Sequence, residues 1–288
     1  MTKRAVAVLG TGLLESGDDA VLAADDLGLT RGDGCFEATR VRTVDPGDHR
    51  IDHLPEHLDR LQASATSLAL GDVDREAWLT LIGQALSEWD QPGESMLKLM
   101  LTRGRESALA TPITGIATVT PLAETTLHQR HHGISVITLG RGTASDTFVD
   151  APWLLGGVKT LSYAVNVAAT RTAVERGADE VIFVSSDGFV LEGPTSAVVW
   201  STDGRLLSTP TGGTGILDSI TQKALFATAE AAGLSTGYAL GTPAELHAAD
   251  GVWLVSSGRG AARVHTLDGV GLATDPVLGA RIVALAGF

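Results

Sequence analysis

The stretch "LLGGVKTLSYAVNVAA", Leu154 to Ala169, contains one of only four lysines in the chain. Lys159 follows Gly156 and Gly157 and precedes a run of small and apolar residues. Such a lysine is either exposed, with its stem lying over apolar side chains, or a buried amine of lowered pKa that forms a Schiff base with a carbonyl. In the second case the paired glycines would let a bulky group approach the backbone. Most lysines are exposed, so this stretch alone favours the first interpretation.

Composition limits the class of protein. The 288 residues are enough for one large domain or two modest ones, with 44% hydrophobic and 19% charged residues. A net charge of −13 argues against binding to nucleic acids or acidic membranes. Cys35, the single cysteine, excludes disulfides within the chain. The N-terminal apolar stretch soon meets Glu15 and Asp18, unlike a signal peptide or membrane span, so we expect a cytoplasmic protein.

The first half of the chain is rich in strands and holds two helices. Apolar residues recur at helical spacing over 55–70, and a second helix is predicted over 75–89. Strands are predicted in "RAVAVLG", "CFEATRVRTV", "SMLKLMLTRG", "ITGIATVTPL" and "GISVITLG". This pattern predicts a smaller α+β domain over residues 1–139. Residues 140–157 show no clear period and are interpreted as an interdomain loop.

The second half, residues 158–288, is predicted to form a larger α/β domain. Helices are predicted over 161–176, 219–232 and the C-terminal "DPVLGARIVALAGF". Strands are predicted in "DEVIFVSSDGFVLEGPTSAVVW", "GVWLVSS" and "AARVHTL".

Three further features are compatible with an anionic aromatic cofactor. Ser219, Ile220 and Thr221 begin a predicted helix, where free N–H groups bind phosphate, although Ser219 could equally be only a cap. Glu192 interrupts an apolar strand, so it is either a turn residue or a buried carboxylate with a cationic partner. Arg60 lies near His57 on a helical face, where a solvated charge is the commoner interpretation.

Taken together and in order, these features resemble a known family. "RGDGCFEATRV", "HLDRL", "LTRG", "GVKTLSYAVN", "GADEVIFVSSDGFVLEGPTSAVV" and "GILDSIT" are similar to the class IV, fold type IV enzymes that use pyridoxal 5'-phosphate (PLP). That family includes branched-chain aminotransferases, D-amino acid aminotransferases and 4-amino-4-deoxychorismate lyases. The resemblance extends from about Asp25 to Arg263 and implies two α/β domains with the cofactor between them, in a homodimer.

The resemblance also implies residue roles. Lys159 would form the Schiff base, Glu192 would pair with the pyridine nitrogen, and Tyr163 would lie near the phenolic oxygen. The expected phosphate contacts are Arg60, Ser219, Ile220, Thr221 and Ser257, with Ser256 next to them. The chain departs from the family pattern at Ala197 and Val199, where an asparagine and an aromatic residue are usual.

The expected reaction is that of the lyase branch. "GDGCF", "TRG" and "KTLSYAVN" are more similar to the lyases, which release 4-aminobenzoate and pyruvate for folate synthesis. The alternatives are a class IV aminotransferase acting on D-amino or branched-chain amino acids and, more remotely, a noncatalytic ligand-binding protein. The lyase substrate carries two carboxylates, so Arg31, Arg103 and Arg259 are candidate substrate contacts. The alternative for Arg103 and Arg259 is a surface turn, and for Arg31 in "RGDG" it is the tight entry into a strand.

No metal site is expected. His128, His131 and His132 in "LHQRHHG" are interpreted as a polar turn. The "GGTG" near Thr211 is not followed by Gly-Lys-Ser/Thr, so it is a loop and not a nucleotide-binding P-loop.

Overall fold

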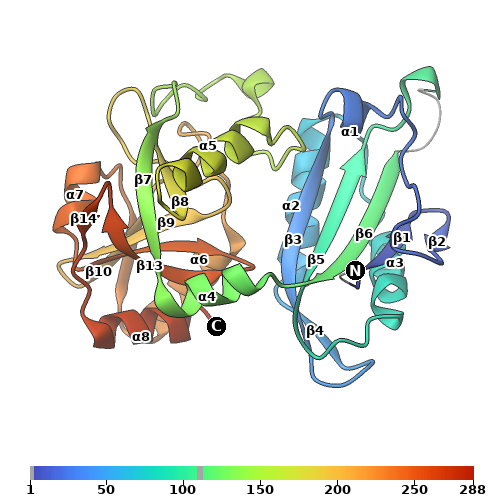
Figure 1. The fold of residues 1–288 in the computed structure, drawn as a ribbon. Helices are drawn as coiled ribbons and strands as arrows, with labels where there is room; N and C mark the ends of the chain where they lie inside the picture. Colours follow the sequence, from blue (N-terminus) through green and yellow to red (C-terminus); the bar gives the residue numbers. More distant parts are fainter. Residues whose placement is uncertain (1–2, 109–112) are drawn as a thin grey trace. The chain divides into compact units, whose positions relative to one another are not determined.

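The computed structural model describes residues 3–108 and 113–288, which form two compact units (Figure 1). The first unit comprises Met1–Ala123 and Val158–Tyr163, and the second comprises Glu124–Gly157 and Ala164–Phe288. These limits differ from the predicted domain limits, because residues 124–139 belong to the second unit and Val158–Tyr163 to the first. Within the described residues, no helix is long and apolar enough to cross a membrane.

The first unit is built on a six-stranded antiparallel sheet with strand order β2-β1-β6-β5-β3-β4. Its strands are β1 Ala5–Val8, β2 Gly12–Leu13, β3 Gly34–Thr43, β4 His49–Ile51, β5 Gly93–Thr102 and β6 Thr114–Pro121. Its helices are α1 Leu27–Thr30, α2 Leu54–Ser67, α3 Arg75–Ser87 and the 3₁₀ turn η1 Glu106–Ala108. The predicted helices at 55–70 and 75–89 correspond to α2 and α3.

Helices α2 and α3 cover one face of this sheet. Leu58 and Leu61 of α2 and Trp78 of α3 pack in one buried cluster with Leu97 and Leu99 of β5. Because successive strand residues point to opposite faces, Lys98 and its β3 partner Ala38 lie on the other face. That face also carries Phe36, two residues before Ala38 on β3.

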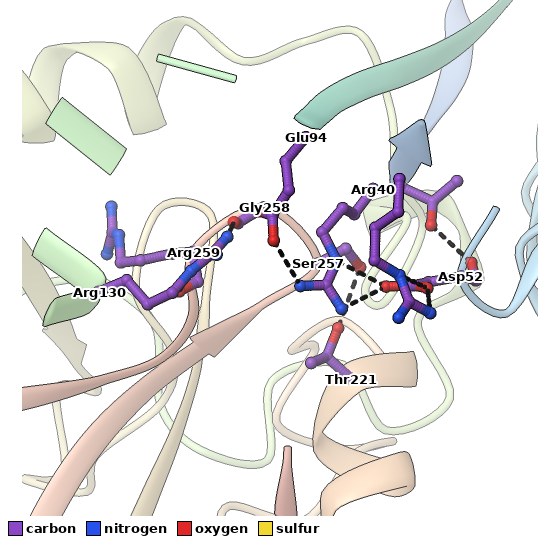
Figure 2. Close-up of polar contacts among 10 residues, drawn as sticks. Arg40, Asp52, Glu94, Arg130, Thr221, Ser257, Gly258 and Arg259 are labelled. Carbon is purple, nitrogen blue, oxygen red and sulfur yellow. Dashed lines mark hydrogen bonds and ion pairs between the residues drawn. The ribbon is translucent and has the colours of Figure 1, made fainter. Parts of the chain in front are cut away.

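At one end of this sheet, Arg40 links strand β3 to the residue after β4 and to the start of β5 (Figure 2). Arg40 of β3 is buried, and its Nε donates to Asp52, which follows β4, at 2.7 Å. Its Nη1 donates to Glu94 at the start of β5 at 3.1 Å. The paired charges satisfy a guanidinium that would be costly to bury alone.

The second unit contains an eight-stranded mixed sheet with order β11-β10-β9-β12-β13-β7-β8, and β14 pairs with β13. The strands are β7 Ile134–Gly140, β8 Glu180–Val184, β9 Ala197–Thr202, β10 Arg205–Ser208, β11 Ser235–Tyr238, β12 Gly251–Ser256, β13 Gly260–Leu267 and β14 Val270–Gly271. The helices are α4 Glu124–His132, α5 Ala164–Glu175, α6 Ile220–Ala231, α7 Pro243–Ala248 and α8 Pro276–Leu285, with the 3₁₀ turn η2 Pro152–Leu154.

Separate apolar clusters cover this sheet. Trp253 of β12 packs with Leu225 of α6 and Ile282 of α8. Leu254, the next residue of β12, packs with Leu246 of α7 in another cluster. The alternation along β12 therefore fixes the two faces of the sheet and sets the position of α6, whose first turn carries candidate site residues.

Two predictions about local structure are wrong. The helix predicted from Leu161 begins only at Ala164, because the preceding residues pair with a strand of the first unit. The histidine-rich stretch predicted as a polar turn is the end of α4.

Candidate active site

The segment that holds Lys159 continues the sheet of the first unit. Phe36 N–H donates to the Lys159 carbonyl at 3.0 Å, and Leu161 N–H donates to the Gly34 carbonyl at 2.8 Å. Because β4 pairs only with the far end of β3, this edge is available to residues 158–163. Lys159 N–H also donates to Ser64 Oγ of α2 at 3.4 Å. Backbone bonds on both sides therefore hold Lys159 in an extended segment.

The Lys159 side chain is half-buried among aromatic rings. Its Nζ lies 4.4 Å from the centroid of the Phe36 ring and 5.9 Å from that of Tyr163. The two rings meet edge to face, with centroids 5.2 Å apart. The ring faces attract the ammonium group and the apolar contacts shield it. The structure thus brings the predicted Lys159 and Tyr163 together and adds Phe36, which sequence analysis missed.

Arg60 is fixed by a buried carboxylate. Its Nε and Nη2 donate to the two oxygens of Glu37 at 2.7 and 2.8 Å, a bidentate pair. His57 Nδ1 lies 2.7 Å from Glu37 Oε2. The Glu37 side chain is only 1% exposed and the Arg60 side chain is 13% exposed. Arg60 is therefore not the solvated helix charge that was the commoner interpretation of the sequence. Glu37 is a further residue that sequence analysis missed.

The pKa shifts of Glu37 and His57 indicate which of the two groups carries a proton. Burial alone would raise the pKa of Glu37, but the hydrogen bonds from Arg60 and His57 lower the pKa from 4.5 to about 2. Burial lowers the pKa of His57, despite the opposing effect of Glu37. At neutral pH Glu37 is therefore ionised and His57 is neutral. The Nδ1 atom of His57 must then carry the proton that it donates to Glu37.

Replacing Glu37 with glutamine should destabilise the protein by about 3–5 kcal/mol at pH 7, because Arg60 loses a buried counter-charge. The folded-state pKa of Glu37 is depressed, so its contribution to stability is complete above pH 4.5 and is lost as the pH falls towards 2. Urea unfolding of wild type and Glu37→Gln at pH 7 and between pH 5 and 2 measures both effects. Glu56→Gln, on the exposed side of α2, is the matched control. A cost below about 1 kcal/mol with an unchanged acid profile would contradict this assignment.

Glu192 lies in the turn before β9 in the second unit. Its backbone carbonyl accepts from Phe183 N–H of β8 at 2.8 Å. Its half-buried carboxylate accepts from Leu217 N–H at 3.1 Å. Asn166 Nδ2 donates to the carbonyl of Pro194 in the same turn at 2.7 Å. The turn therefore holds Glu192 in place, although Ala197 supplies no side-chain amide.

The predicted phosphate turn is the N-terminus of α6. Ser219 caps the helix and accepts from Gln222 N–H at 3.3 Å, as the cap alternative predicts. Ile220 and Thr221 form the first turn, whose N–H groups have no partners within the helix. Thr221 Oγ1 lies 3.0 Å from Ser257 Oγ (Figure 2). The structure thus brings two predicted hydroxyls together at the positive end of a helix.

Local packing and backbone conformation explain the two glycines before Lys159, Gly156 and Gly157. A Cβ at Gly156 would lie 2.4 Å from the Phe148 ring, and one at Gly215 would lie 2.3 Å from it. Gly157 N–H donates to the Gly215 carbonyl at 2.9 Å, and Gly157 has a φ of 75°. Close packing around Phe148 and a left-handed backbone thus account for these glycines without invoking a bound group.

The three arginines predicted to bind substrate have acidic neighbours in the protein. Arg103 pairs with Asp33 at 2.5 Å and donates to the Leu68 carbonyl at 2.6 Å. Arg259 pairs with Glu180 at 2.8 Å. Arg31 is exposed and lies 3.9 Å from Glu106. The internal bonds of Arg103 and Arg259 argue against direct roles in substrate binding.

Lys98 is an exposed cation on the same sheet face as Phe36. Its Nζ lies 5.8 Å from the centroid of the Phe36 ring that Lys159 also contacts. Alternation along β5 places Lys98 opposite the apolar face of Leu97 and Leu99, and the structure shows that Lys98 and Lys159 contact the same Phe36 ring.

The histidines of α4 form no metal site with other described residues. His128 and His132 stack with ring centroids 4.0 Å apart, one helical turn from each other. Within the described ranges no group of three or more His, Cys, Asp or Glu could hold a metal ion.

Comparison with known proteins decides the family. Residues 34–267 match the model of "Amino-transferase class IV". The chain belongs to the class IV aminotransferase family. A Mycobacterium tuberculosis protein named "Bifunctional aminodeoxychorismate lyase / D-amino acid transaminase" is 43% identical over 265 residues, which cover 89% of each chain.

Solved structures give the same family and fold. An M. tuberculosis "hypothetical aminotransferase" in its PLP-bound form has a TM-score of 0.91 at 40% identity and covers 99% of this chain and 98% of its own. The same protein was also solved with alpha-ketoglutarate and PMP, with a TM-score of 0.91 at 41% identity and 98% coverage of both chains. A fold IV-transaminase from Curtobacterium pusillum has a TM-score of 0.89 at 38% identity, with 99% and 100% coverage.

These findings confirm the predicted family, fold, cofactor and enzyme class. The class IV family and the mixed α/β fold of type IV are those expected from the sequence. The predicted PLP cofactor agrees with the PLP carried by a solved relative that spans nearly the whole chain. The family is one of enzymes, and its relatives include proteins named for both lyase and transaminase activity.

Proposed function

We propose that this protein is a PLP-dependent 4-amino-4-deoxychorismate lyase, with transamination of D-amino acids as a second activity. The observation that carries the proposal is the pair of ammonium groups at the Phe36 ring, one for the reaction and one for a substrate carboxylate. The 43% identity to a protein named for both activities supports it. Homodimer formation and a role in folate synthesis are part of the proposal because of the family resemblance, and a cytoplasmic location is also proposed.

The residues present fit PLP. Thr221 and Ser257 offer two hydroxyls beside the free amides at the start of α6, which is the donor set that a phosphate needs. Arg60 adds a cation whose plane Glu37 fixes. Glu192 is a carboxylate held by a backbone amide, and such a group can keep a pyridine nitrogen protonated. Tyr163 is proposed to lie near the phenolic oxygen.

Lys159 is the residue proposed to move protons. PLP supplies an aldehyde that captures amines and an electron sink for negative charge at the neighbouring carbon. Lys159 Nζ removes the proton from the carbon that bears the substrate amine. The adjacent carbon–oxygen bond breaks, the enolpyruvyl group leaves with a proton from Lys159 as pyruvate, and the ring becomes aromatic. With an amino acid that lacks such a leaving group, Lys159 would instead deliver the proton to the cofactor side of the carbon–nitrogen bond, and hydrolysis would then give a 2-oxo acid, which is the course of a transamination.

Lys98 is proposed to bind one substrate carboxylate. It is exposed, and it is a cation on the sheet face that also presents Phe36 to Lys159. A carboxylate held there would orient the substrate towards the reactive amine, and orientation alone can contribute several kcal/mol to the rate. The role that sequence analysis gave to Arg103 and Arg259 thus passes to Lys98.

A product assay tests the proposal. We expect the PLP-loaded protein to form 4-aminobenzoate and pyruvate in equal amounts from 4-amino-4-deoxychorismate. Slower exchange is expected between D-alanine and 2-oxoglutarate, and least between L-leucine and 2-oxoglutarate. Brisk amino-acid exchange without 4-aminobenzoate would contradict the lyase assignment and establish an aminotransferase. Neither product, with no uptake of PLP, would contradict both enzyme assignments and leave the noncatalytic ligand-binding protein as the alternative.

The Lys98→Gln variant sharpens this assay. Losing a charge-assisted contact of about 1.5–3 kcal/mol should lower kcat/KM for the lyase substrate by roughly 10- to 100-fold. The half-reaction of D-alanine with the PLP-loaded protein, measured without 2-oxoglutarate, should change less, because D-alanine has a single carboxylate. Equal losses for both substrates would contradict a specific role for Lys98 in binding the second carboxylate.

A further inference from the structure

A three-residue turn of the second unit carries one of the proposed phosphate ligands. Strands β12 and β13 are antiparallel, with Ser256 opposite Gly260, so Ser257, Gly258 and Arg259 form the turn between them. The Ser257 hydroxyl meets Thr221 in the first turn of α6 (Figure 2). Contacts that fix the backbone of this turn therefore also fix the position of the Ser257 hydroxyl, which is proposed to bind the phosphate.

Arg130 of α4 holds the backbone of this turn. Its Nη2 donates to the Gly258 carbonyl at 2.7 Å and its Nε donates to the Arg259 carbonyl at 3.1 Å (Figure 2). Arg130 is the only buried residue of α4, at 8% exposure. Its guanidinium carbon also lies 4.9 Å from the centroid of the Phe288 ring. A planar guanidinium with donors in fixed directions can hold two successive carbonyls in a set orientation, whereas the single ammonium group of a lysine has no such fixed fork.

A buried ion pair holds the side chain of the same turn. Arg259 Nη2 donates to Glu180 Oε2 at 2.8 Å, and the Glu180 side chain is only 3% exposed. Arg259 Nε and Nη1 are buried without hydrogen-bond partners in the described part of the chain. Burying guanidinium donors in this way costs stability. Stability alone therefore does not explain why two arginines converge on a single short turn.

We propose that Arg130 is a positioning residue for the cofactor phosphate. Its two bonds hold the Gly258 and Arg259 carbonyls, and the turn in consequence keeps the Ser257 hydroxyl beside Thr221 at the start of α6. The Glu180–Arg259 pair supports the same turn from its side chain. The inference rests on the proposed function, because it assumes that Ser257 and Thr221 bind the phosphate of PLP.

The test compares two ligands that differ only in the phosphate. Apoprotein is titrated with PLP and with pyridoxal, and the visible absorption of the lysine adduct gives both dissociation constants. We expect Arg130→Gln to weaken PLP binding on the order of 10-fold while pyridoxal binding changes less than about 2-fold, because a displaced turn loses geometry only towards the phosphate. Arg130→Lys keeps the charge but not the fork and should fall between wild type and Arg130→Gln.

Arg281→Gln is the matched control. Arg281 also donates from Nη2 to a backbone carbonyl, that of Ala232 at 2.9 Å, but it does not touch the turn. This variant should retain the wild-type ratio of PLP to pyridoxal affinity. If Arg130→Gln does not fold, the PLP and pyridoxal affinities are compared in Arg130→Lys instead.

Two outcomes would overturn the inference in distinguishable ways. Equal loss of PLP and pyridoxal affinity, or unchanged PLP affinity in a folded Arg130 variant, would reduce Arg130 to a structural residue and leave the phosphate site standing. If the wild-type protein bound PLP and pyridoxal with equal affinity, the proposed phosphate site would not exist, and the inference would lose its basis.

Discussion

Replacing Lys159 with alanine should reduce turnover with both substrate types by at least about 10⁴-fold, because the protein loses the group that moves protons as well as the amine that binds the cofactor covalently. The hydrogen bonds that hold residue 159 in the sheet and to Ser64 use only its own main-chain N–H and carbonyl, so the fold should survive. PLP should still bind noncovalently through the first turn of α6. Steady-state kinetics with 4-amino-4-deoxychorismate and with D-alanine measure the loss.

Lys223→Ala is the matched control for this prediction. Lys223 is an exposed lysine that pairs with Asp218 near the start of α6. Its removal should leave turnover within about 2-fold of wild type, because exposed ion pairs contribute little. Turnover of Lys159→Ala within 10-fold of wild type would show that another group performs the proton transfers.

Replacing Glu192 with glutamine should lower kcat by about 30- to 1000-fold, equivalent to about 2–4 kcal/mol in the transition state. A neutral amide cannot hold the pyridine nitrogen protonated, so the electron sink weakens. The Leu217 N–H can still donate to the amide oxygen of glutamine, so we expect the unfolding temperature to change little. Kinetics and thermal unfolding of the same samples separate the two effects.

Glu245→Gln provides the comparison for Glu192. The Glu245 carboxylate likewise accepts from a backbone amide, that of Thr242 at 2.7 Å, in the capping box of α7. Its replacement should cost some stability and no turnover. If Glu192→Gln behaved in the same way, Glu192 would be a turn residue only.

Short motifs made part of the site predictable. Lys159, Glu192 and the start of α6 each carry a signal within a few residues, and their order indicated the family that the comparisons confirm. Arg60 was identified, but its partner Glu37 is 23 residues away on another element. No local periodicity records such a pairing, so the ion pair of Arg60 with a buried carboxylate was not predictable.

Helix α4 shows why other parts of the fold and of the site could not be predicted from the sequence. Its sequence "ETTLHQRHH" contains one apolar residue, so no hydrophobic period indicates a helix. Its buried residue is Arg130, whose carbonyl partners lie 128 and 129 residues later. The Glu180–Arg259 pair spans 79 residues in the same way. Arg259 therefore looked like a surface arginine available to substrate, although its partner is internal.

The limits of the predicted domains differ from those of the two compact units for a related reason. In the sequence, residues 158–163 directly precede a helix and are therefore predicted to belong to the second domain, but their backbone hydrogen bonds go to Gly34 and Phe36. The pairing partner is more than 120 residues earlier in the chain. Only the sheet edge that the short strand β4 leaves open explains why Lys159 belongs to the first unit.

The most direct test of the central claim is to locate the covalent bond to the cofactor. Wild-type protein loaded with PLP is reduced with borohydride, digested, and searched by mass spectrometry for a pyridoxyl-lysine. We predict a single modified peptide containing Lys159, with Lys3, Lys98 and Lys223 unmodified and no label in Lys159→Ala. Stoichiometric label on another lysine, or no label despite PLP in excess, would contradict the account.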